Sequence, residues 1–386
     1  SRVPFFLRIG MRLGRIFWVI ILLSVLPLTA NAQWNFNIST ENEYNDNPFR
    51  SQLPTETFIN SLNFDLRKEF DLFSLQYSGN YFNFSAVPER NFYMHQLSAS
   101  VSFENGAMGI IAEQRLGKDI YTYFDYTNIT GYYTHQFNIE DYYLTLTPNL
   151  SLTKYPGISI LDNSKISLST LLNHGFDSGT TVILGGAFTF KKYLNPTQYG
   201  EYTYLDENNS LVTERYIDQN ISSLTQILSF ARIAQSVTPT TGIAAQFTNR
   251  SILSGVASFV KDLNMIYGDE SEIFDDPVNY EGNNYSVEVT QILFDDLTLK
   301  GSLFLNNKFY PSQGVYDQAN NYDTGIMRSD KQKIFNFTLN KSFPLGDSES
   351  INLNLGLQYQ WIDNSSNSTL FNYRSNSVNL SLGIEF

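Results

Sequence analysis

Charged side chains are sparse in this chain, and many of them take the polar positions of stretches that alternate between polar and apolar residues. They make up 16% of the sequence, whereas about 25% is typical of soluble domains. Successive side chains of an extended strand point to opposite sides, so the charges of each stretch share one side. Acids and bases held along one polar surface predict recognition by charge rather than bond-making chemistry. The ten candidates are Glu43, Asp65, Arg67, Glu113, Arg115, Lys191, Arg250, Glu288, Lys300 and Lys308.

An acidic stretch and three histidines are the remaining candidates for chemistry. Five acids lie between Gly268 and Pro277. Clustered carboxylates suit calcium, but the spacing does not match an EF-hand loop, so a solvated acidic loop is favoured over a cation site. A long loop here could instead fold inward as a constriction. His95, His135 and His174 share no ligand or catalytic spacing, so we expect no metal site, no cofactor and no enzyme activity.

Composition and net charge exclude several classes of site and partner. The chain has no cysteine, which rules out disulfides, thiolate metal sites and cysteine nucleophiles. Acids outnumber bases by 38 to 25, which argues against a nucleic acid partner because phosphate binding needs a basic footprint. Aromatic residues reach 15%, and many stand at the ends of alternating stretches, where amphipathic rings suit the headgroup layers of a membrane.

Residues 1–32 read as an export signal peptide. Arginines precede an apolar stretch from Ile16 to Leu28, and Ala30-Asn31-Ala32 forms a small-residue cleavage site. Met11 could be the true start, which would place residues 1–10 upstream of it. We therefore expect a single mature domain over 33–386.

The rest of the chain repeatedly alternates over stretches of about 10–14 residues. In 142–152 and 351–359, for example, one side is Leu, Ile or aromatic, and the other is Asn, Thr, Ser, Gln or Gly. Strands of soluble sandwiches are usually about 5–6 residues long, whereas a tilted strand that crosses hydrocarbon needs about 9–11. Sixteen strands are predicted, at 34–45, 57–68, 72–85, 91–103, 107–118, 126–137, 142–154, 164–175, 180–193, 218–234, 242–252, 283–294, 297–310, 332–343, 350–362 and 371–386.

The breaks between these strands alternate in length. The short set is 69–71, 104–106, 138–141, 177–179, 238–241, 295–296 and 344–349, and the long set includes 194–217, 253–282 and 311–331. Short turns at one end and long loops at the other are typical of outer-membrane barrels. The sequence thus predicts an all-β, transmembrane, antiparallel up-and-down barrel of about 16 strands, with short periplasmic turns and longer extracellular loops.

Two places conflict with regular strands. Pro148 falls on the apolar side of the stretch 142–154, although proline removes a ladder donor and is usually confined to edges or bulges. In 218–234 the apolar residues do not keep one phase, which predicts a bulge.

The last ten residues strengthen the membrane interpretation. Their apolar side is Val378, Leu380, Leu382, Ile384 and Phe386. An alternating strand that ends on an aromatic residue resembles the C-terminal strand of bacterial outer-membrane β-barrels. The resemblance implies that these five residues are the signal read by the barrel assembly machinery, and that the protein lies in the outer membrane of a Gram-negative bacterium.

The expected function is porin-like: passive, weakly selective diffusion of small hydrophilic solutes through an interior wide enough for water. The ten charges would line that interior and filter solutes by a field across it, or they would pair in salt bridges that only brace the wall. The alternative is a non-conducting structural or accessory barrel, closed by its loops, that serves adhesion, secretion or surface-polysaccharide handling. A hydrophobic-substrate channel is a third hypothesis, for which Pro148 is the only hint. Partners would be membrane lipid, the assembly machinery and small solutes.

Overall fold

The computed structural model describes residues 33–205, 211–220, 223–255, 280–294, 297–319, 321–345 and 351–385. The expected signal peptide, the acidic stretch and the terminal Phe386 lie outside the described residues. Among the described residues, none of the helices could span a bilayer.

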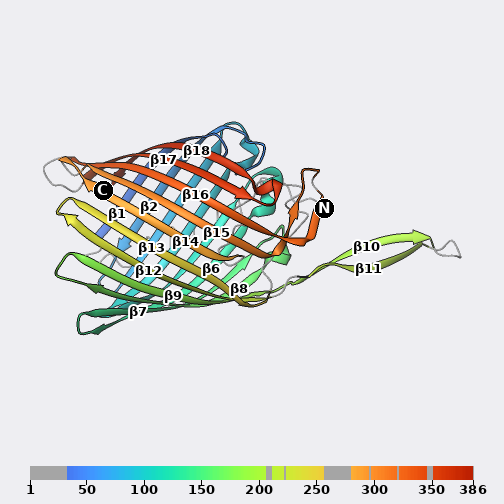
Figure 1. The fold of residues 1–386 in the computed structure, drawn as a ribbon, viewed down its shortest axis with the longest axis horizontal. Coiled ribbons are helices and arrows are strands. Elements are labelled where there is room, and N and C mark those ends of the chain that lie inside the picture. Colours follow the sequence, from blue (N-terminus) through green and yellow to red (C-terminus); the bar gives the residue numbers. More distant parts are fainter. Residues whose placement is uncertain are drawn as a thin grey trace.

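Sixteen antiparallel strands close into a barrel, in an order that follows the chain except that β9 is followed by β12 (Figure 1). The predicted 16-stranded up-and-down barrel is confirmed. Its strands are β1 (Gln33–Asn45), β2 (Thr57–Glu69), β3 (Phe73–Phe84), β4 (Phe92–Phe103), β5 (Gly106–Leu116), β6 (Tyr126–Ile139), β7 (Tyr142–Lys154), β8 (Asn163–Gly175), β9 (Thr180–Tyr193), β12 (Leu224–Thr238), β13 (Thr241–Ser254), β14 (Glu281–Ile292), β15 (Thr298–Tyr316), β16 (Tyr322–Leu345), β17 (Ile351–Ser366) and β18 (Tyr373–Glu385).

The two ends of the chain's strand series meet and close the wall. β1 pairs with β18 from Asn37 opposite Glu385 to Asn45 opposite Ser377. Along β18, Val378, Leu380 and Leu382 of the expected assembly signal are exposed on the outer face, and Leu380 is 55% exposed. Closure leaves no free strand edge in the wall, which a structure surrounded by hydrocarbon requires.

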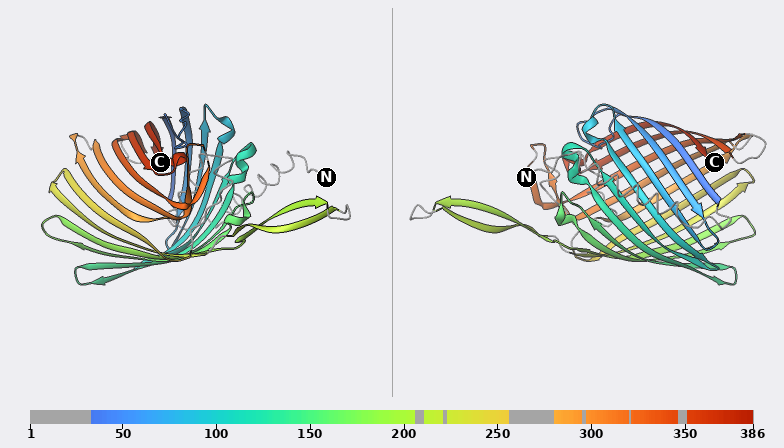
Figure 2. Two further views of the ribbon diagram at one scale, coloured as in Figure 1. Left: turned by 45° about the vertical axis from the view of Figure 1, so that its right-hand side comes forward. Right: turned by 180° about the vertical axis from the view of Figure 1, so that it is seen from behind.

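The wall is apolar on the outside and polar on the inside, the reverse of a soluble barrel. Side chains such as Ile110, Leu150 and Ile166 are more than half exposed on the outer face. The turns at one end are short, and the loops at the other end carry the 3₁₀ helices η1 (Pro88–Arg90), η2 (Asp119–Phe124), η3 (Ser159–Leu161) and η5 (Thr369–Phe371). Figure 2 shows the barrel from two further sides.

The long segment predicted as the loop 194–217 instead contains a hairpin. Its strands, β10 (Thr197–Leu205) and β11 (Leu211–Asn220), pair with each other and with no wall strand. The hairpin projects beyond the loop end of the barrel (Figures 1 and 2). A long excursion from the wall still has to satisfy its backbone N–H and C=O groups, and pairing back on itself achieves that.

Two further boundaries differ from the sequence prediction. β15 extends into the expected loop 311–331 as far as Tyr316, and β16 begins within it at Tyr322. Between them, the backbone N–H of Asp317 donates a hydrogen bond of 3.0 Å to the carbonyl oxygen of Asn321. In this segment, hydrogen bonds from the side chain and backbone of Asn321 and the backbone of Ala319 hold the pKa of Asp317 below its usual range. The strand predicted at 218–234 begins only at Leu224, and its pairing with β13 shifts register near both ends.

Pro148 interrupts the pairing of two neighbouring wall strands. β6 and β7 pair continuously down to Tyr132 opposite Asn149, and pairing resumes only at His135 opposite Leu146. Proline has no N–H to donate, so the ladder is lost at the two intervening positions. A hydrogen bond of 3.1 Å between the hydroxyls of Thr134 and Thr147 bridges the gap.

We expect Pro148→Val to stabilise the barrel by about 1 kcal/mol, because valine restores a donor to a ladder bond and keeps an apolar outer side chain. Denaturant unfolding of the refolded barrel measures the change, and amide exchange at Tyr133 and Thr134 locates it. Leu150→Val, on the same strand and face, is the control. Unchanged exchange at Tyr133 and Thr134 would show that the proline does not cause the interruption.

Candidate functional site

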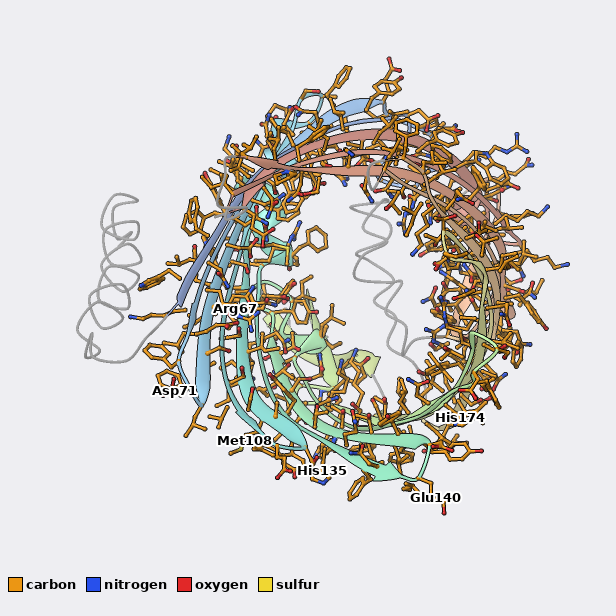
Figure 3. The ribbon with its side chains drawn as sticks, turned by 90° about the vertical axis from the view of Figure 1, so that its left-hand side faces the viewer. Arg67, Asp71, Met108, His135, Glu140 and His174 are labelled. Atoms are coloured by element: carbon orange, nitrogen blue, oxygen red, sulfur yellow. The ribbon has the colours of Figure 1, made fainter. Side chains whose placement is uncertain are left out.

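The candidate site is the inner wall of the barrel. All ten charges selected from the sequence take the opposite side of their strands from the exposed apolar residues; Glu288, for example, lies between the exposed Val287 and Val289. Figure 3 looks along the barrel from the turn end, with Arg67 on the inner side of the ring and Met108 and His135 on the outer side.

Three of the inner charges form one cluster. Glu288 on β14 contacts Lys300 Nζ of β15 at 2.9 Å and Arg232 Nη2 of β12 at 3.3 Å. The cluster therefore spans four neighbouring strands and bridges across β13. Its three side chains are 23–47% exposed, so each pair contributes at most about 1 kcal/mol to stability.

Sequence reasoning missed Arg232. The inward Leu228 and Phe230 on the same strand obscured its phase, but the exposed Ile227 and Ile233 place residue 232 inward. If the phase of the strand is taken from Ile227 and Ile233 alone, the sequence predicts that Arg232 faces inward.

Acids gather on β1 and β2, where most of their partners are uncharged. Glu41 accepts a hydrogen bond of 3.0 Å from the Asn379 side chain, and Glu43 accepts one of 2.7 Å from Asn45. Asp65 accepts a short hydrogen bond from Ser78. Arg67 lies beside them and pairs with Glu69 at 2.7 Å. This sector of the inner wall is therefore predominantly negative.

Bases gather on the facing sector. Counted around the wall, β9 lies eight strands from β1, and β12 lies eight strands from β2. From β8 to β15, Glu288 is the one acid at an inward position of the described wall strands. The inward bases of that sector are Lys165, Lys191, Arg232, Arg250, Lys300 and Lys308.

Several bases lie near the loop end against aromatic rings; Arg115 and Lys191 are buried there, and Arg250 is partly buried. The Arg115 guanidinium lies 4.6 Å from the centre of the Phe92 ring, and Lys191 Nζ lies 5.1 Å from that of Tyr193. Arg250 donates a hydrogen bond of 3.0 Å to the Tyr280 hydroxyl. The faces of aromatic rings attract cations, which offsets part of the cost of removing these charges from water.

The mouth at the loop end contains a buried ion pair outside the predicted set. Arg328 and Asp330, on β16, have side chains only 6% and 2% exposed. Arg328 Nη1 donates to Gln313 at 3.0 Å, and its guanidinium lies 3.4 Å from the centre of the Phe371 ring. Asp330 also accepts a hydrogen bond of 3.3 Å from Asn364. The end of β15, β16, β17 and η5 are thus tied together.

A second buried cluster lies at the same end of the barrel. Phe124 of η2 packs with Ile158, Ile160 and Leu161 around η3 and with Tyr193. Further along the rim, the Arg90 guanidinium lies 3.8 Å from the centre of the Phe49 ring and 4.7 Å from that of Tyr121. The loops at 46–56, 85–91, 117–125 and 155–162 therefore form a continuous packed collar.

The histidines lie on the outer face, away from these charges. His135 stacks beside Tyr133, and His174 Nδ1 lies 2.8 Å from the Asp141 carbonyl oxygen at one of the short turns. Within the described ranges, no three His, Cys, Asp or Glu side chains are placed to hold a metal ion.

Comparison with known proteins gives fold likeness only. No family model and no curated relative matches the sequence. Among solved structures, OccAB2 of Acinetobacter baumannii is similar over 92% of this chain and 98% of its own, with 11% identity and a TM-score of 0.48. A bacterial polysaccharide outer membrane secretin is similar over 92% of this chain and 97% of its own, with 7% identity and a TM-score of 0.47. OmpT of Vibrio cholerae is similar over 94% of this chain and 99% of its own, with 9% identity and a TM-score of 0.42. These distant likenesses extend to the closed β-barrel fold alone.

We expect Asp330→Asn to destabilise the barrel by roughly 3 kcal/mol, because it removes the buried negative charge that pairs with Arg328. Asp363→Asn is the matched control, since Asp363 also pairs with an arginine, Arg374 at 2.8 Å, but that arginine is 78% exposed. The control should cost less than about 1 kcal/mol. Denaturant unfolding compares the two, and equal losses would contradict the burial argument.

Proposed function

We propose that the protein is a porin-like channel for passive, weakly selective diffusion of small hydrophilic solutes across the outer membrane. The observation that carries the proposal is the charged and amide-rich inner wall of a closed 16-stranded barrel. Polar groups in a dry core need partners, whereas around water they do not. Barrels of 16 strands leave an aqueous channel.

Sorting of charge gives the channel its basis for selection. Acids on β1 and β2 face bases on β8 to β15, so a solute between them experiences a field directed across the lumen. Such a field orients dipolar solutes and distinguishes ions by sign. Hollows of about 420 Å³ beside Glu41 and about 160 Å³ beside Arg232 and Glu288 lie along the inner wall. Diffusion of this kind requires no catalytic group and no cofactor.

A second function is favoured by the two buried clusters at the loop end, one around Arg328 and one around Phe124. Arg328, Gln313 and Phe124 are almost completely buried at the loop end, which supports an accessory barrel whose mouth is closed by its loops. Such a barrel would act in adhesion, secretion or surface-polysaccharide handling. Such a barrel would have the same wall as the channel but would not conduct ions.

Two partners follow from the wall itself. The apolar outer face suits membrane lipid, and the exposed Val378, Leu380 and Leu382 on β18 suit recognition by the barrel assembly machinery. β18 is also the strand that closes the barrel on β1, so its recognition would couple insertion to closure.

Planar-bilayer recording of the refolded chain 33–386 tests the channel. Stable open steps are expected, and Glu288→Gln should shift the reversal potential in a salt gradient towards anion preference, because it removes the acid between Arg232 and Lys300. Glu140→Gln, at a periplasmic turn, is the control and should leave the potential unchanged.

Silence from a correctly folded barrel would overturn the channel and favour the closed accessory barrel. Open steps with identical reversal potentials in wild type and Glu288→Gln would retain the channel but reject selection by the inner charges.

A further inference from the structure

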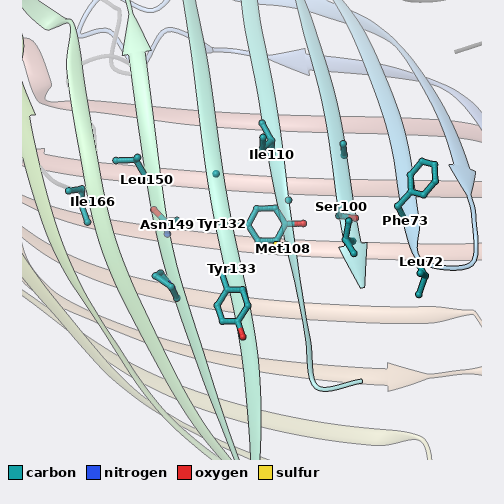
Figure 4. A pocket seen from close by; sticks show the side chains of 15 residues that line it. Leu72, Phe73, Ser100, Met108, Ile110, Tyr132, Tyr133, Asn149, Leu150 and Ile166 are labelled. Atoms are coloured by element: carbon teal, nitrogen blue, oxygen red, sulfur yellow. The ribbon is translucent and has the colours of Figure 1, made fainter. Parts of the chain in front are cut away.

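A hollow on the outer face crosses the wall from β3 to β8. Its volume is about 1070 Å³, which is at the upper end of the range for small-molecule sites. Figure 4 shows its lining, which includes Leu72, Val101, Met108, Ile110, Leu150 and Ile166. These side chains are apolar and exposed, so the hollow is a depression in the lipid-facing surface.

Small and irregular residues form the floor of this hollow. Gly131 has open space where a Cβ would stand, and Ala99 and Pro148 lie among the lining residues. Pro148 also marks the interruption of pairing between β6 and β7. The hollow therefore results from a gap in the outer layer of side chains, beside the irregular part of the wall.

Along the membrane normal, the hollow extends over about the depth of one leaflet. Its rows of residues run across the strands, from Phe73 at the first residue of β3 to Ile166, the fourth residue of β8. Five strand spacings of about 4.8 Å give roughly 24 Å. At a strand tilt of about 45°, this row climbs roughly 17 Å, close to half of the ~30 Å hydrocarbon core.

The periplasmic end of the hollow is negatively charged. Asp71 and Glu104 are exposed on adjacent turns, which a backbone hydrogen bond of 3.0 Å from Ser102 to Leu72 ties together. The turns 70–72 and 104–105 contain no Lys or Arg. The nearby Lys68 is 5% exposed, with its Nζ 4.6 Å from the Trp34 ring centre.

We propose that the hollow binds an acyl chain of a phospholipid from the periplasmic leaflet, with a headgroup that carries an ammonium. The hollow continues the lipid-facing surface, so an acyl chain enters it without leaving hydrocarbon. Asp71 and Glu104 attract an ammonium and repel a headgroup that is only anionic. The proposal does not depend on whether the lumen conducts.

Native mass spectrometry of the refolded barrel tests the site, with phosphatidylethanolamine and phosphatidylglycerol of identical chains as probes. Wild type should retain phosphatidylethanolamine more tightly than phosphatidylglycerol. Gly131→Leu fills the hollow and should weaken retention about tenfold or more. Gly301→Leu is the matched control, since Gly301 on β15 has the same open space outside the hollow.

A separate double variant tests the contact between the acids and the headgroup. Asp71→Asn combined with Glu104→Gln should remove the preference for phosphatidylethanolamine while Gly131 still admits a chain. Circular dichroism confirms that each variant folds as a barrel.

Equal retention by wild type, Gly131→Leu and Gly301→Leu would overturn the site. Equal retention of the two lipids by wild type would overturn the ammonium preference. If Gly131→Leu changes the oligomeric state in sedimentation and leaves lipid retention unchanged, the hollow is an interface with a second copy and the lipid proposal is wrong.

Discussion

Hydrocarbon offers no partner for a peptide N–H or C=O, and this constraint governs the rest of the structure. Every wall strand must pair on both sides, so the first strand has to meet the last. The β1–β18 ladder satisfies that requirement over nine residue pairs. Where a donor is missing, at Pro148, the wall loses only two pairs, and a threonine pair on neighbouring residues spans the gap. Pro148 is tolerated because the continuous pairing on either side of it holds β6 and β7 in place.

Closure also decides where charge can be placed. With most outward positions taken by apolar side chains, the inner face collects many of the acids, bases and amides. The Arg232–Glu288–Lys300 cluster and the acids of β1 and β2 then lie on facing walls because of strand order alone. Their separation keeps most of these charges from neutralising each other. The charges of Arg328 and Asp330 at the loop end differ from those of the inner wall, because they are paired and buried away from water. Their contacts hold the rim together and do not act on solutes.

Most of the wall could be predicted from sequence because a period of two is set by backbone geometry and persists over each strand. The same rule gave the inward side of the ten charges. Partners were harder, since Arg232 and Glu288 are 56 residues apart and meet across β13 only in one register. The Arg328–Asp330 pair was missed because the stretch 311–331 reads as a loop, rich in Gly, Asn and Asp, although its ends extend the wall strands. The hairpin at β10 and β11 escaped notice for a related reason: it pairs with itself, so no pattern shared with the wall reveals it.

That hairpin also separates two electrostatic environments. Strands of nine and ten residues reach roughly 30 Å from the rim, several times the screening length of about 8 Å in physiological salt. The charges of the barrel are therefore not felt at its far end. A macromolecule too large for the lumen reaches the hairpin before it reaches the rim. Its first contact therefore depends on the residues of β10 and β11 and not on the charges of the barrel. The outer edges of this two-stranded sheet present backbone N–H and C=O groups with which a strand of such a macromolecule can pair, whereas the closed wall has no such edge.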